Sequence, residues 1–361
     1  MTAGTFPSLR TTRRFFSVLV VVLLVACSDS SDPTGPGSPE ARSVAAVVNS
    51  TEMSLTIFSL DDPDDRTTVG LGADGTPVGG AVRGEVAAIP LGVVPAVAIV
   101  DLAAGELLRT VSLPEGSGAT GAHFVNDSIV LVANPLRGSV SPVNVRSGEV
   151  DSEIETGAYP QAFAESGGRI FVVNSELDES FQPVRDGTLT VLDAGTLEVL
   201  GQVELGARNS GGVTTGPDGR LLVMNSGSWG AADGTLSIVD PTSLQEVSLH
   251  EGFGDFPGSV AVTPDGRVFA SSWSFGLVEW DLSTAAFVRG PDHAIAPGGV
   301  PSSAGVAVDP GGAVWSFFPE CAEASSVLRL GADHEVAEEV PTGMCPSAML
   351  FTVLNGGPSA R

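Results

Sequence analysis

The residues that could do chemistry are few and scattered along this 361-residue chain. The four histidines lie far apart, with no spacing that would bring two imidazoles to one metal ion; they are His123, His250, His293 and His334. The motifs GxSxG, HExxH and CxxCH are absent, as is a Walker-type phosphate loop. The sequence therefore gives no support to a hydrolase, a nucleotide-binding protein or a haem protein, and we predict no catalytic residue.

Acidic side chains could support one further kind of chemistry, which is calcium binding. Glu176, Asp178 and Glu179 crowd one segment, and Ca²⁺ is bound by carboxylate and amide oxygens. A calcium site needs oxygen ligands that converge from several parts of a chain, and a single acidic segment is typically a solvated loop. We therefore expect this segment to face water, and we predict no metal site.

Short repeated strands must position whatever site exists. The chain has 45 Gly, 25 Pro and many short Val-rich runs, which is typical of an all-β protein. The segments GRIFVVN (168–174), GRLLVMN (219–225) and GRVFASS (266–272) recur at spacings of 51 and 47 residues. A strand and tight turn precede each segment, and two more strands follow. Four short strands at a period of about 45 residues predict a β-propeller, with seven blades between Ser43 and Leu354 and six or eight as the alternatives.

The two ends of the repeat array complete one another. SAMLFTVL (347–354) has the pattern of a first strand but no partner strands follow it, whereas SVAAVVNS (43–50) begins as a second strand with no first strand before it. We predict that the C-terminal strand pairs with the N-terminal strands in one blade, because this closure removes two open sheet edges.

A family resemblance supports this fold. FVVN, LVMN and LVAN, with first strands such as PQAFA, resemble the repeats of bacterial YVTN-type propellers, which are relatives of WD-repeat-like and lactonase-like propellers. The resemblance covers residues 43–354. Lactonase-like propellers hold a calcium ion on the central channel, so the resemblance also implies an alternative function, a divalent-metal-dependent envelope lactonase or lyase.

The N-terminus has the features of an export signal. Arg10, Arg13 and Arg14 precede an apolar run from Val18 to Ala26, which is too short to span a bilayer comfortably. Cys27 follows directly and resembles the modified cysteine of a bacterial lipobox, which implies cleavage before Cys27 and diacylation of its sulfur. We expect a lipoprotein signal peptide at 1–26, lipidated Cys27 with a disordered tether at 27–42, the propeller at 43–354 and a flexible tail at 355–361.

These features predict a location in the bacterial cell envelope. Ser28 after Cys27 favours the outer membrane, by resemblance to lipoprotein sorting signals, over the outer leaflet of the cytoplasmic membrane. Outside the cytoplasm Cys321 and Cys345 remain as an even pair. Both fall in segments that emerge on one face of a propeller, at adjacent blades, so we predict that they form a disulfide.

The charge of the chain limits its partners. All 17 basic residues are arginines, and removal of residues 1–26 takes the formal charge from −26 to −29. Such a chain repels phosphate backbones, so we expect no nucleic-acid partner. A cationic partner is compatible with this charge, and so is a role in solubility alone.

The longest loops share the predicted face of the cysteines, and aromatic and amide side chains on it suit a small-ligand or peptide site. The candidates are Tyr159, Gln161, Asn174, Trp229 and Trp273. Core and ligand roles are both open for Trp229, whereas Trp280 and Trp315 lie within strands and are predicted to be core. We expect His123, on a first strand, to be a structural imidazole. The sequence thus predicts a membrane-anchored binding or scaffold module for a protein, peptide or glycan, with no cofactor.

Overall fold

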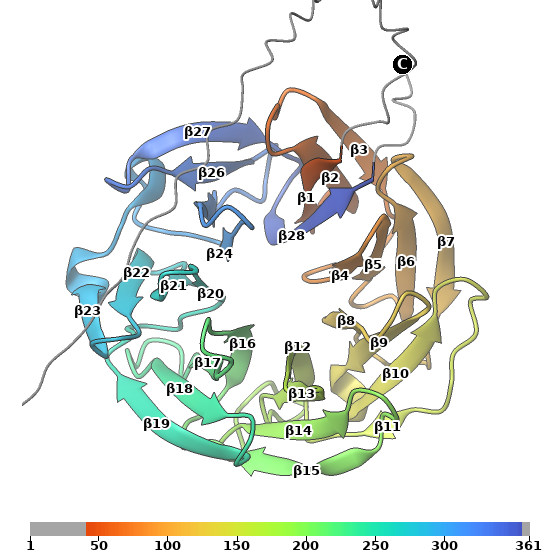
Figure 1. The fold of residues 1–361 in the computed structure, drawn as a ribbon, viewed down its shortest axis with the longest axis horizontal. Coiled ribbons are helices and arrows are strands. Elements are labelled where there is room, and N and C mark those ends of the chain that lie inside the picture. The colour runs from red at the N-terminus through yellow and green to blue at the C-terminus, as the bar shows by residue number, and fades with distance from the viewer. Residues whose placement is uncertain (1–40, 356–361) are drawn as a thin grey trace, which may run out of the picture. The chain divides into compact units, whose positions relative to one another are not determined.

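The computed structural model describes residues 41–355, which form seven four-stranded antiparallel sheets arranged around a central axis (Figure 1). Each sheet is one blade of a propeller, and each blade runs from an inner strand beside the axis to an outer strand at the rim. The prediction of an all-β, seven-bladed propeller is therefore confirmed, and six or eight blades are excluded.

The strands fall into four sets by their distance from the axis, and each set is given in the order of blades 1 to 7. The inner strands are β28 (Pro346–Leu354), β4 (Ala81–Arg83), β8 (Ala122–Phe124), β12 (Pro160–Ser166), β16 (Ser210–Thr215), β20 (Val260–Val262) and β24 (Gly305–Val308). The second strands are β1 (Arg42–Asn49), β5 (Val86–Pro90), β9 (Ile129–Asn134), β13 (Arg169–Asn174), β17 (Leu221–Asn225), β21 (Arg267–Ser272) and β25 (Val314–Phe317).

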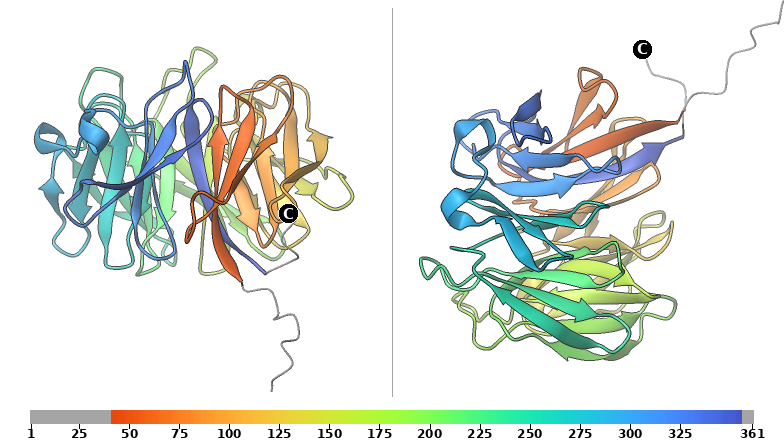
Figure 2. Two further views of the ribbon diagram at one scale, coloured as in Figure 1. Left: turned by 90° about the horizontal axis from the view of Figure 1, so that it is seen from above. Right: turned by 60° about the vertical axis from the view of Figure 1, so that its left-hand side comes forward.

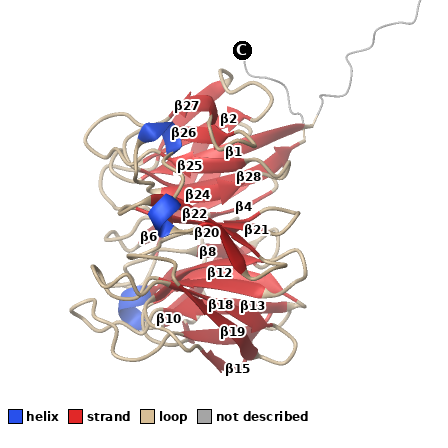
Figure 3. Cartoon of the chain, turned by 90° about the vertical axis from the view of Figure 1, so that its left-hand side faces the viewer, coloured by secondary structure: helices blue, strands red, loops and turns tan. Residues whose placement is uncertain are grey.

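The third strands are β2 (Ser54–Ser59), β6 (Ala96–Asp101), β10 (Ser139–Asn144), β14 (Thr188–Asp193), β18 (Thr235–Asp240), β22 (Gly276–Asp281) and β26 (Ser326–Leu330). The outer strands are β3 (Arg66–Gly70), β7 (Glu106–Ser112), β11 (Ile154–Glu155), β15 (Val199–Glu204), β19 (Gln245–Glu251), β23 (Ala286–Arg289) and β27 (Val336–Pro341). Three short 3₁₀ turns lie between strands, at the margin of the body (Figure 3); they are η1 (Pro135–Arg137), η2 (Pro291–His293) and η3 (Pro297–Gly299).

Blade 1 closes the ring as predicted. Its sheet has the order β28-β1-β2-β3, so the C-terminal strand is the inner strand of the blade that contains the first strand of the described chain. The pairing of β28 with β1 runs from Arg42 opposite Leu354 to Asn49 opposite Pro346, with one irregularity beside Asn49. The predicted disulfide between Cys321 and Cys345 is present and links a loop of blade 7 to the segment that leads into β28.

The ring has two different faces. We call the loop face the one formed by the second-to-third-strand loops and by the connections from an outer strand to the next blade. The opposite turn face carries the tight turns between first and second and between third and fourth strands. Because Arg42 begins a second strand and Leu354 ends an inner strand, both described chain ends lie on the turn face, side by side at the lower edge of the ring (Figure 2, left).

Polar side chains that fold back on the backbone hold the turn face. An acidic or amide side chain at the end of a third strand accepts the N–H groups two and three residues further on, in five blades; these residues are Asp101, Asn144, Asp193, Asp240 and Asp281. The backbone N–H donors hold the pKa values of Asp193 and Asp240 below their usual range. These turns are short because each is stabilised by its own side chain.

Apolar side chains fill the spaces between neighbouring blades. Trp280 and Trp315 are each 1% exposed, which confirms their predicted place in the core. Trp280 of blade 6 packs near Phe253, which lies in the connection from blade 5. The rings of Trp315 in blade 7 and Phe58 in blade 1 have centroids 5.8 Å apart. Aromatic contacts thus help to join neighbouring blades. No helix within residues 41–355 is long and apolar enough to cross a bilayer.

Candidate binding face

A repeated polar clamp positions the loop face. In four blades an asparagine ends the second strand, and its amide N–H₂ donates to two hydroxyl groups on the third strand at 2.8–3.2 Å; the asparagines are Asn49, Asn134, Asn174 and Asn225. Each is fully buried. Asn174, a candidate for the ligand face, therefore lies inside blade 4, where its amide ties β13 to β14 and does not reach solvent.

Two of these clamps explain the Thr-Gly segments that precede β12 and β28. A Cβ on Gly157 would lie 2.7 Å from Asn174 Nδ2, and a Cβ on Gly343 would lie 2.9 Å from Asn49 Nδ2. Only glycine leaves room for the asparagine at such an approach. An acidic side chain then accepts the next backbone N–H, from Ala158 to Glu176 (3.3 Å) and from Met344 to Glu52 (3.0 Å).

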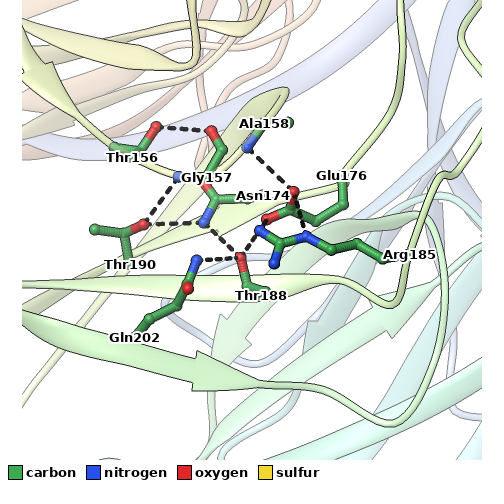
Figure 4. A network of polar contacts seen from close by, with 9 residues as sticks. All are labelled: Thr156, Gly157, Ala158, Asn174, Glu176, Arg185, Thr188, Thr190 and Gln202. Carbon is green, nitrogen blue, oxygen red and sulfur yellow. Dashed lines mark hydrogen bonds and ion pairs between the residues drawn. The ribbon is translucent and has the colours of Figure 1, made fainter.

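Glu176 corrects one expectation about the acidic segment. Asp178 and Glu179 are exposed as predicted, but Glu176 is 1% exposed. Its carboxylate accepts from the Thr188 hydroxyl (2.6 Å) and the Arg185 guanidinium (2.9–3.0 Å), as Figure 4 shows. The hydrogen bond to Glu176 raises the pKa of Arg185. The carboxylate is buried because the loop returns after nine residues and brings Arg185 back to it.

Residues that precede inner strands hold the loops in place. Four of them have a positive φ, between 48° and 61°: Tyr159, Asn209, Phe256 and Cys345. Each contacts a second-to-third-strand loop. The ring of Tyr159 meets Phe181 edge-on at 5.8 Å, and the ring of Phe256 meets Trp229 edge-on at 5.3 Å. Asn209 donates a hydrogen bond to Gly227 O (3.2 Å), and Cys345 forms the disulfide with Cys321. Tyr159 and Asn209 thus hold a loop of the blade that they lead into, whereas Phe256 and Cys345 hold a loop of the preceding blade.

Large exposed apolar side chains fall into two groups, one on outer strands and β28 and the other on the loop face. The second-to-third-strand loops of five consecutive blades, blades 2 to 6, each present at least one: Val93, Leu136, Phe181, Val184, Trp229 and Trp273. Trp229 is 69% exposed, Phe181 58% and Trp273 48%. The turns of the turn face, within residues 41–355, contribute no large exposed apolar side chain. Of the candidates, Trp229 and Trp273 are therefore open to solvent, and the alternative core role of Trp229 is excluded.

The central channel opens onto the loop face through a hollow of about 280 Å³. Residues at or just before the start of the inner strands of blades 2 to 5 line it, together with Ala348 of β28. Several are glycines, which leave the space unfilled; the lining includes Gly79, Gly80, Gly121, Gln161 and Gly211. Gln161, another candidate, lies here, and its amide bonds the Ser175 hydroxyl. Tyr159 is half-buried, and burial raises its pKa. Of the five candidates, the structure thus places four at or near the loop face.

His123 joins two blades beside the channel. Its Nε2 lies 3.1 Å from Glu165 Oε2 on the inner strand of blade 4, and its ring lies parallel to Phe163 at 6.1 Å. Burial lowers the pKa of His123, while the hydrogen bond and charge of Glu165 oppose that shift. The imidazole has the structural surroundings that were expected. Within residues 41–355, no three His, Cys, Asp or Glu side chains gather as they would around a metal ion.

Sequence reasoning missed most of the exposed apolar loop residues. Phe181, Val184, Leu136 and Val93 were not singled out, although each lies in a segment rich in Gly, Pro, Ser or acidic residues between two strands. The pattern alone does not separate them from buried residues of similar segments, since Leu91 in the loop of Val93 is 2% exposed.

The fold defines a class, the seven-bladed β-propellers. A hydrazine synthase chain of Kuenenia stuttgartiensis is a solved structure of this shape, with a TM-score of 0.61, 16% sequence identity, and coverage of 78% of this chain and 96% of that chain. At this identity the likeness concerns the fold alone. No family model matches the sequence, and no curated protein matches it.

Proposed function

We propose that this protein is an extracytoplasmic binding module, attached to a bacterial membrane by lipid on Cys27, whose loop face binds a protein, peptide or glycan partner. The observation that carries the proposal is the asymmetry of exposed apolar side chains, which lie on the loops of five consecutive blades and are absent from the described turns of the opposite face. Exposed apolar groups on one face of a soluble domain mark an interaction surface. The FVVN-type repeats support assignment to the YVTN-type propellers.

The proposed anchor and the proposed binding face are compatible. The described chain begins at the turn face, where Arg42 pairs with Leu354. A tether that reaches Cys27 from this point would leave the propeller on the side away from the exposed loops. Two or three acyl chains on Cys27 would hold the protein firmly to a bilayer. The loop face, opposite the end at which the described chain begins, would then remain open to a partner in the envelope.

Position-dependent crosslinking tests the binding face. A photo-crosslinking amino acid is placed in place of Val93, Leu136 or Phe181 on the loop face, and in place of Asp62 or Ser128 on the turn face, in cells that express the full chain. We expect discrete crosslinked products from the loop-face positions only. Equal products from both faces, or none from the loop face, would contradict the proposal.

Labelling with an alkyne fatty acid tests the anchor separately. We expect Cys27→Ala to abolish incorporation of the label and to release the protein from the membrane fraction. Label retained on C27A would exclude this lipidation site without bearing on the loop face. The alternative, a divalent-metal-dependent lactonase or lyase, has no observation among residues 41–355 that favours it.

A further inference from the structure

The exposed tryptophans of blades 5 and 6 form one patch around a single carboxylate. Asp255, in the connection between these blades, accepts from the backbone N–H of Gly230 (2.6 Å) and from the Ser274 hydroxyl (2.9 Å). Gly230 adjoins Trp229, and Ser274 adjoins Trp273, so Asp255 fixes both tryptophan loops. Phe256 supports the indole of Trp229 edge-on at 5.3 Å. We call Trp229, Phe256, Trp273 and Asp255 the aromatic patch.

Among residues 41–355, the surroundings of the patch are acidic and every arginine on the loop face is paired with a carboxylate. The loop-face loops and connections of residues 41–355 carry twelve acidic residues and three arginines. Each arginine already lies beside a carboxylate, in the pairs Arg137–Glu153, Arg185–Glu176 and Arg208–Asp186 at 2.6, 2.9 and 3.5 Å. The three loops that form the patch contain two carboxylates, Asp233 and Asp255, and no basic residue. The potential over the patch therefore favours a cation.

We propose that the aromatic patch docks a basic peptide segment of the partner, with an arginine or lysine placed over the indole rings beside Asp255 and an apolar neighbour against Trp229. This inference rests on the proposed binding function and names its partner chemistry. Indole faces attract guanidinium and ammonium groups, and nearby carboxylates strengthen the attraction. Tryptophan is also the residue type most often responsible for binding energy in protein interfaces.

A peptide fits the loop face better than a glycan or an acidic partner. A neutral sugar could stack on Trp229, but it gains nothing from an excess of nine negative charges over the loops. It also leaves exposed the aliphatic side chains elsewhere on the loop face, such as Val184 and Leu136, whereas a protein partner could bury them together with the rings. An acidic partner would be repelled by the same charges.

Selection from a random peptide library tests the proposal. The full mature chain, immobilised through its C-terminus so that the loop face is free, is panned against displayed twelve-residue peptides, and affinities are measured for the enriched sequences. We expect enriched peptides with net positive charge and at least one large apolar residue. Their binding should weaken about tenfold or more in the double variant Trp229→Ala, Trp273→Ala, and it should fall as salt is raised.

A matched control separates patch recognition from general attraction to an acidic protein. Leu108→Ala removes an exposed apolar side chain from the outer strand β7 of blade 2, which does not belong to the loop face. This variant should leave peptide binding unchanged. All variants are checked by thermal melting, since the tryptophans are exposed and their removal should not unfold the ring. Basic peptides that bind equally to the tryptophan variant would overturn the proposal.

The remaining outcomes separate this inference from the proposed function. Enrichment of acidic or uncharged peptides, or oligosaccharides on an array that bind through Trp229 and Trp273, would overturn the basic-peptide inference and leave the loop face as a binding surface. If no peptide is enriched but the loop face crosslinks to a partner in cells, the basic-peptide inference would again be overturned and the loop face would remain a binding surface. No enriched peptide and no loop-face crosslinks would overturn both.

Discussion

The disulfide between Cys321 and Cys345 should contribute measurably to the closure of the ring. The two cysteines are 24 residues apart and join blade 7 to the segment that leads into β28, the last strand to enter blade 1. Backbone hydrogen bonds run beside it, from Cys345 N to Glu320 O (3.0 Å) and from Ser50 N to Cys345 O (2.9 Å). The covalent link therefore restrains a segment that must be placed before β28 can pair with β1.

The chain-entropy estimate gives the size of the effect. A loop of this length loses about 3.5 kcal/mol of unfolded-state conformational freedom at 25 °C when it is crosslinked. The unfolding entropy of a propeller of about 315 residues is on the order of 0.65 kcal/mol/K, so removal of the link should lower Tm by about 5 °C. Both cysteines are only partly buried, and replacement by serine should add little cost of its own.

The assay is a thermal melt of Cys321→Ser, Cys345→Ser beside the wild type, each with and without reductant. We expect the reduced wild type to match the double variant, and reductant to leave that variant unchanged. Hydrogen exchange should accelerate at residues 342–350 and stay unchanged in β13, on the other side of the ring. Equal Tm values for oxidised and reduced protein would refute the reasoning, as would exchange that rises equally in all blades.

Three further predictions concern buried polar groups. Burial gives His123 a lower pKa in the folded than in the unfolded state, so the wild type should lose stability as pH falls from about 7 to about 5. Over that range the Tm of the wild type should fall more than the Tm of His123→Gln. A constant difference between the two Tm values would contradict the prediction. In denaturant titrations Asn225→Ala should lower the free energy of unfolding by about 1 kcal/mol more than Asn174→Ala. The reason is that Asn225 Oδ1 accepts a hydrogen bond from the Ser210 hydroxyl at 2.6 Å, whereas Asn174 Oδ1 has no partner. Equal losses of free energy would exclude a role for that bond. Gly157→Ala should lower the free energy of unfolding by about 2 kcal/mol, because the added methyl overpacks the asparagine clamp. Gly70→Ala is the control: its added methyl meets no atom within 4 Å, so it should be nearly neutral. Similar losses in both variants would show that clamp packing is not the cause.

The fold could be predicted from the sequence because the pattern repeats. GRIFVVN and GRLLVMN contain the whole of the second strands β13 and β17, and both end at a clamp asparagine. The unmatched strands at the two ends indicated the closure of blade 1 for the same reason, since a first strand without partners at one end and a blade without a first strand at the other can be completed in one way. The cysteine pair followed from that topology, because segments on one face of adjacent blades can meet.

The surroundings of single side chains were harder to predict. Asn174 had been assigned to the ligand face because amides suit ligand sites, but its position at the end of β13 places it opposite two threonine hydroxyls, which bury it. Glu176 had been expected to face water because acidic segments are usually solvated, and nothing in the local sequence shows that Arg185 returns to it. Such outcomes depend on the path of a loop, which the strand pattern does not specify.

The difference between the two faces follows from how each stabilises its backbone. On the turn face a side chain such as Asp240 accepts the N–H groups of its own turn, so the turn is short. On the loop face the asparagine clamp ties neighbouring strands below the loops and leaves the loops free to vary in length and sequence. Blade 4 uses this freedom for a loop of 13 residues between β13 and β14, and blade 5 for the loop that carries Trp229. Exposed apolar residues can accumulate there without cost to the ring, which is why we place partner recognition on this face.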